Sequence, residues 1–107
     1  MRQLALSLVA ILASCATEAP PDAGSAAGQR LAEIHCSSCH AVGAAGESPN
    51  PEAPPFRTLS RSYQVATLEE ALAEGISVGH PAMPAFAFAP DDVQALVSYL
   101  ESIQEQP

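Results

Sequence analysis

Two long irregular stretches, residues 41–62 and 76–89, occupy much of this 107-residue chain. Both are rich in proline, and neither shows the apolar periodicity of a helix or a strand. Structureless segments of this length are uncommon in a compact domain unless they wrap around something. The chain is long enough for one small domain, whose hydrophobic core would be thin. A large apolar ligand at the centre would complete such a core.

Two short helices are expected, one before the first irregular stretch and one between the two stretches. Residues 26–35 carry apolar side chains on one helical face. The second helix is expected over residues 67–74, because Thr67 and Glu70 have the spacing of a capping box. Gly75 then suits the left-handed residue that follows a helix.

The clearest element is a helix expected from Pro90 onward, with Asp91 and Asp92 in its positively polarised first turn. Its apolar residues form one stripe, Val93, Leu96, Val97, Leu100 and Ile103. No segment alternates with period two over a useful length. The fold class is therefore predicted to be all-α, with three to four helices and long loops.

The N-terminus has the pattern of an export signal over residues 1–14, with Arg2 before a short apolar run. The run is too short to span a bilayer. Residues 12–15 (LASC) resemble the bacterial lipobox, in which Cys15 would become lipidated. Ordinary cleavage after Ala16 is the alternative, because small residues flank that bond.

The residues that follow the signal divide into a tether and a domain. Residues 15–25 carry two adjacent prolines and no apolar period, and are interpreted as a flexible tether. Residues 26–107 then form the domain. The expected location is the bacterial periplasm, with a membrane anchor through Cys15.

The charge balance is strongly acidic. The chain has twelve Asp and Glu residues, four Arg and no Lys, which gives a net charge of −8. Nucleic-acid binding requires clusters of basic side chains, so this composition argues against it. Three cysteines are an odd number, which a simple disulfide framework does not explain.

Residues 36–40 (CSSCH) are the motif that carries chemistry. C-x-x-C-H is the signature of c-type haem attachment, in which two thiols join the porphyrin edge and the histidine binds iron. Cys36 and Cys39 would attach one haem covalently, with His40 as its axial ligand. A thioredoxin-like site would need a βαβ context, a zinc site would need a fourth ligand, and a plain disulfide would leave His40 unexplained.

Met83 is the candidate for the second axial ligand. It lies in a proline-bordered irregular segment rather than on a helical core stripe, and thioether ligation raises a haem reduction potential. His80, three residues earlier, is the rival ligand. His35 directly precedes Cys36, too close to reach the opposite haem face, and is expected to be a surface residue.

The order of these features resembles that of a small bacterial class I cytochrome c over residues 26–105. C-x-x-C-H near the start, a Met-Pro loop and a terminal helix carry this resemblance. It implies the small monohaem cytochrome c fold, with Gly28 and Tyr99 where the first and last helices cross. It also implies that the Pro55 carbonyl accepts a hydrogen bond from the imidazole of His40.

The resemblance implies further residues around the haem. Arg57, Arg61 and Tyr63 match residues that neutralise or hydrogen-bond haem propionates. The expected walls of the haem pocket are Phe56, Leu59, Ile76 and Phe86.

The function expected from this resemblance is electron transfer by a monomeric carrier that is not an enzyme. Expected partners are redox proteins: a quinol–cytochrome c oxidoreductase or dehydrogenase as donor, and an oxidase or peroxidase as acceptor. One alternative is a haem-based gas or ligand sensor in which Met83 is labile. Another is a zinc-stapled structural module.

Overall fold

The computed structural model describes residues 10–11, 23–75 and 82–105, and within these ranges it contains helices and no strand. The helices are α1 (Ala23–His35), α2 (Leu68–Glu74) and α3 (Pro90–Ser102). Two 3-10 helices, η1 (Phe56–Arg61) and η2 (Val65–Thr67), precede α2. The predicted all-α class is confirmed.

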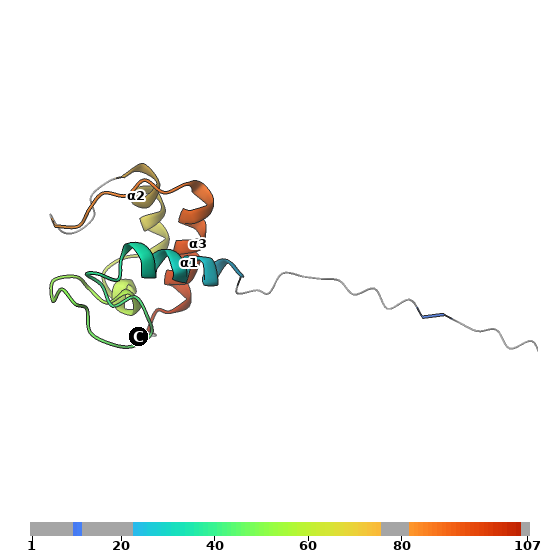
Figure 1. Cartoon of the computed structure of the whole chain (residues 1–107), viewed down its shortest axis with the longest axis horizontal. Helices are drawn as coiled ribbons and strands as arrows, with labels where there is room; N and C mark the ends of the chain where they lie inside the picture. The colour runs from blue at the N-terminus through green and yellow to red at the C-terminus, as the bar shows by residue number, and fades with distance from the viewer. Residues whose placement is uncertain (1–9, 12–22, 76–81, 106–107) are drawn as a thin grey trace, which may run out of the picture.

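The frame of the domain is the crossing of α1 over α3 (Figure 1). Gly28 lies at the closest approach. A Cβ atom at Gly28 would lie 2.0 Å from the backbone oxygen of Ala95 and 2.7 Å from Cβ of Tyr99. Only glycine permits this approach, so the expected Gly28–Tyr99 crossing is confirmed. Ala32, one turn further along α1, is completely buried.

α3 contributes most of the core. The predicted stripe is buried except for Ile103, which packs partly buried against the same cluster, and Tyr99 joins the stripe on the buried face. The Tyr99 hydroxyl donates a hydrogen bond of 2.5 Å to the carbonyl oxygen of Val42, which ties α3 to the loop after the C-x-x-C-H motif. Burial raises the pKa of Tyr99, and the negative charge of Glu33 raises it further.

The start of α2 differs from the prediction. Thr67 has helical backbone angles and belongs to η2, so its side chain does not cap α2. Its hydroxyl instead donates to the carbonyl oxygen of Gln64 at 2.6 Å. The capping-box prediction is wrong because a 3-10 turn runs directly into the helix. The end is as predicted: Gly75 is left-handed, with φ of 77°, and its N–H donates to Ala71 O.

Residues after α3 close the domain against η1. The side-chain amide of Gln104 donates to the carbonyl oxygens of Phe56 and Leu100, both at 2.7 Å. Its oxygen accepts a hydrogen bond from the backbone N–H of Ser60 at 2.8 Å. One side chain therefore joins the end of α3 to η1.

The helix at the N-terminal end of the domain begins at Ala23, so the tether expected over residues 15–25 includes three residues that are helical. Cys15 and nearly all of the predicted signal lie outside the described residues. Within the part of the chain that is described, no helix is long and apolar enough to cross a membrane.

Candidate haem site

The C-x-x-C-H motif forms a tight turn that continues α1. Cys36 N–H donates to the carbonyl oxygen of Ala32, and the N–H groups of Cys39 and His40 both donate to the carbonyl oxygen of Cys36. Asn50 N–H then donates to Cys39 O at 3.0 Å, which brings the following loop back over the turn. The backbone thus holds both cysteines and the histidine on one rigid turn.

The two thiols have different surroundings. Cys36 is buried and Cys39 is exposed. Burial raises the pKa of the Cys36 thiol from 9.0 to about 11, because the thiolate loses its hydration. The Cys36 sulfur therefore lies in apolar surroundings, which suit a buried thioether.

His40 is held by a hydrogen bond of 2.7 Å between its Nδ1 and the carbonyl oxygen of Pro54. A carbonyl can only accept, so Nδ1 carries the proton and Nε2 keeps its lone pair for a metal. The prediction of Pro55 is wrong by one residue, since the Pro55 oxygen accepts instead from the N–H and hydroxyl of Thr58. The Phe56 ring lies 4.8 Å from the imidazole, centroid to centroid.

A cavity of about 430 Å³ opens beside this turn and is mainly apolar. Its volume falls within the range of small-molecule and cofactor sites. Its lining comes from the C-x-x-C-H turn, the loop up to η1, α2, α3 and the segment that carries Met83. The expected site residues that line it are Cys36, Cys39, His40, Phe56, Leu59, Tyr63, Met83 and Phe86.

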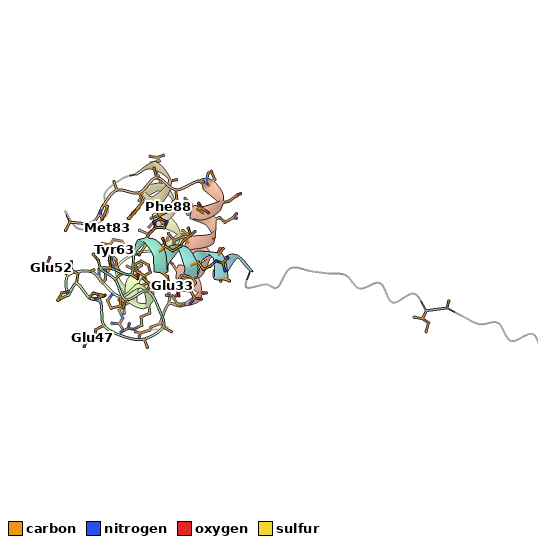
Figure 2. All side chains as sticks on the ribbon, viewed as in Figure 1. Glu33, Glu47, Glu52, Tyr63, Met83 and Phe88 are labelled. Carbon is orange, nitrogen blue, oxygen red and sulfur yellow. The ribbon has the colours of Figure 1, made fainter. Side chains whose placement is uncertain are left out.

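Met83 reaches this cavity from a segment far along the chain. Residues 82–89 run beside α2, and Phe88 N–H donates to the carbonyl oxygen of Leu72 at 2.9 Å. Met83 is half-buried and lines the cavity that His40 also lines. Figure 2 shows Met83 and Tyr63 on the same side of the molecule. His80 and Ile76 lie outside the described residues.

The family model for "Cytochrome C oxidase, cbb3-type, subunit III" matches residues 23–100. The chain belongs to this family. The match spans the three α-helices, except for the last two residues of α3, and it includes the C-x-x-C-H turn and Met83. It confirms the resemblance to small c-type cytochromes. No curated protein matches the chain, and no solved structure does.

A cytochrome c domain of this kind binds haem c, and the cavity fits that group. It joins an apolar lining with two cysteines, and it contains a histidine whose tautomer is already set for metal binding. Among the described residues, no three His, Cys, Asp or Glu side chains gather as they would around a metal ion.

Arg57 and Arg61, the arginines predicted to face haem propionates, do not line the cavity. Arg57 donates to the Glu105 carboxylate at 3.1 Å and to the carbonyl oxygen of Gly46 at 2.6 Å. Arg61 pairs with the other carboxylate oxygen of Glu105 at 2.6 Å. The prediction that they face haem propionates is not supported, because both are engaged by a residue 44 to 48 positions away.

The sequence did not predict the contacts of two residues at the site, His35 and Gln104. His35 is exposed as expected, but its ring also contacts Phe86 and Phe88 and lines the cavity. Gln104 forms the clamp between α3 and η1. Neither residue belongs to a motif, so no local signal in the sequence marked them.

Proposed function

We propose that this chain is an exported electron carrier that holds one haem c, attached covalently through Cys36 and Cys39, with His40 and Met83 as axial ligands. One observation carries the proposal. His40, with its Nδ1 proton held by Pro54, and Met83 line the same apolar cavity.

The chain's own residues would tune this site. A bound haem c supplies an iron that alternates between Fe(III) and Fe(II), one electron at a time. The Pro54 carbonyl orients the His40 imidazole and strengthens Nε2 as a ligand. The thioether of Met83 would favour the reduced iron. It would also occupy the sixth coordination position of the iron and so keep small molecules out. The apolar walls limit water around the iron, which also raises the potential.

The proposed partners are redox proteins with a basic or mixed-charge docking face. The net charge is −8, and acidic side chains such as Glu33, Glu47 and Glu52 are exposed (Figure 2). Electrostatic attraction of this kind speeds encounter and weakens as salt rises. A quinol–cytochrome c oxidoreductase or a dehydrogenase would be the donor, and an oxidase or peroxidase the acceptor. The name of the matched family, an oxidase subunit, supports a terminal oxidase as acceptor.

We also propose that a lipid on Cys15 holds the carrier at the periplasmic face of a membrane. The LASC sequence at the end of the apolar run supports this. In the native host, the protein is expected in the membrane fraction after mild lysis, and Cys15→Ala is expected to release it. Recovery of the wild-type protein in the soluble periplasmic fraction would exclude the anchor.

The decisive experiment is an optical spectrum of the purified exported protein, oxidised and reduced, with and without CO. A low-spin c-type spectrum, a far-red ferric Met–iron band and no response to CO are expected. Met83→Leu keeps the apolar volume but removes the sulfur, so it should lose the band, lower the potential and bind CO. Ready CO binding by the unmodified protein would favour the sensor, and absence of haem with zinc present would favour the structural module.

A further inference from the structure

Three aromatic rings join the end of α1 to the segment that carries Met83. The His35 ring lies 5.3 Å from the Phe88 ring and 6.0 Å from the Phe86 ring, centroid to centroid, in edge-to-face geometry. Phe86 and Phe88 stack on each other at 5.2 Å with an angle of 16° between their planes. All three separations and orientations are those of favourable ring pairs.

This ring cluster, His35 with Phe86 and Phe88, connects two parts of the site that are distant in sequence. His35 is the last residue of α1 and directly precedes Cys36. Phe86 is three residues after Met83, and both line the cavity, as does His35. The cluster therefore joins the turn that carries the haem-attachment residues to the segment that carries the second ligand.

The segment also contacts α2 and the residue that follows it. Phe88 N–H donates to the carbonyl oxygen of Leu72, and the backbone of Phe86 passes close to Gly75. These contacts fix the segment relative to α2. His35 supplies a contact to α1, and its imidazole meets two rings at once, which a small aliphatic side chain could not do.

We propose that His35 is a positioning residue that holds the Met83 segment in place and so sets how firmly Met83 occupies the sixth position. This inference rests on the proposed function, because it assumes that Met83 is a ligand. His35 acts through the rings of Phe86 and Phe88 and does not itself bind iron. Loss of the ring contacts would let the segment move away and would open the sixth position to external ligands.

The test measures cyanide binding to the ferric, haem-loaded protein, together with the far-red band. His35→Ala is expected to bind cyanide about tenfold more tightly, the size of effect that one or two ring contacts supply, and to show a weaker band. His35→Phe restores a ring and is expected to stay within about twofold of the unmodified protein. Ile34→Ala is the control, because Ile34 is the neighbouring residue and is 73 % exposed. It is expected to change nothing.

A second measurement follows the segment itself. Amide hydrogen exchange at Phe88, whose N–H bonds to Leu72, should be faster in His35→Ala and unchanged in His35→Phe. If His35→Ala does not accumulate as a haem protein, Phe86→Leu removes a partner ring from the other side of the contact. It is expected to produce the same tighter cyanide binding.

The outcomes separate this inference from the proposed function. If Met83→Leu binds cyanide tightly while His35→Ala and Phe86→Leu behave like the unmodified protein, the role of His35 is wrong and Met83 ligation stands. If Met83→Leu leaves both the band and cyanide affinity unchanged, the proposed ligation itself is wrong. Equal effects of His35→Ala and His35→Phe would show that the ring contact is not the cause.

Discussion

Gly28→Ala is expected to destabilise the domain strongly, although alanine is the better helix former. The added Cβ would lie 2.0 Å from the backbone oxygen of Ala95 and 2.6 Å from its carbonyl carbon. These are backbone atoms of α3, so no side-chain rotation relieves the clash, and the two helices must separate. Because α1 and α3 form the frame of the domain, that separation loosens the packing around Ala32 and Tyr99.

The expected magnitude follows from two opposed effects. Overpacking of a tight interior costs up to about 3 kcal/mol, and a clash with backbone belongs at that upper end. Replacing a helical glycine by alanine stabilises the helix by about 1 kcal/mol. The net loss is about 2 kcal/mol, or a fall in Tm of about 8–16 °C for a domain of this size.

Thermal unfolding of the haem-loaded protein, followed by circular dichroism, measures this loss. Gly43→Ala is the matched control, because a Cβ at Gly43 meets nothing within 4 Å. The control is expected within about 0.5 kcal/mol of the unmodified protein. A Gly28→Ala variant as stable as Gly43→Ala would refute the close helix crossing.

Three further predictions concern single residues. Gln104→Leu should lower the free energy of unfolding by about 2 kcal/mol, measured by chemical denaturation, because it leaves two carbonyls and one N–H without their partner. Gln94→Leu, on the exposed face of α3, is the control and should be nearly neutral. In the haem-free chain at pH 8, iodoacetamide should modify exposed Cys39 well before Cys36. Burial disfavours the Cys36 thiolate and raises the pKa of the thiol to about 11. The reaction of Cys36 should therefore accelerate only as the pH approaches that value. Equal rates for Cys36 and Cys39, measured by mass spectrometry, would contradict the difference in burial. Gly75→Ala should cost about 1 kcal/mol in thermal unfolding, because Gly75 has a φ of 77°, and no loss would argue against the left-handed helix end.

Local patterns in the sequence were sufficient to predict where the helices lie, although not the start of α2, and to single out the C-x-x-C-H turn. The α3 stripe has the period of a helix, and its residues are buried or pack against the core as that period requires. The spacing of Cys36, Cys39 and His40 spans one backbone turn, so these residues stay together whatever the rest of the chain does. Resemblance to a family placed Gly28 at the helix crossing, because that contact follows from the family's shared fold.

Tertiary structure alone decided the contacts made by irregular segments. The hydrogen bonds from Asn50 to Cys39 and from Phe56 to Ala41 set the register of the loop, and this register presents Pro54 to His40. Two consecutive prolines carry no local signal that distinguishes one carbonyl from the other.

The same limit applies to the arginines and to the ring cluster. Arg57 and Arg61 look free for a propionate in the sequence, yet Glu105 reaches both from beyond the end of α3. His35 meets Phe86 and Phe88 across about fifty residues. Helical periodicity and motif spacing depend on neighbours along the chain, and they are therefore visible in the sequence. Contacts between distant loops depend on how the whole chain closes, and only the folded structure reveals them.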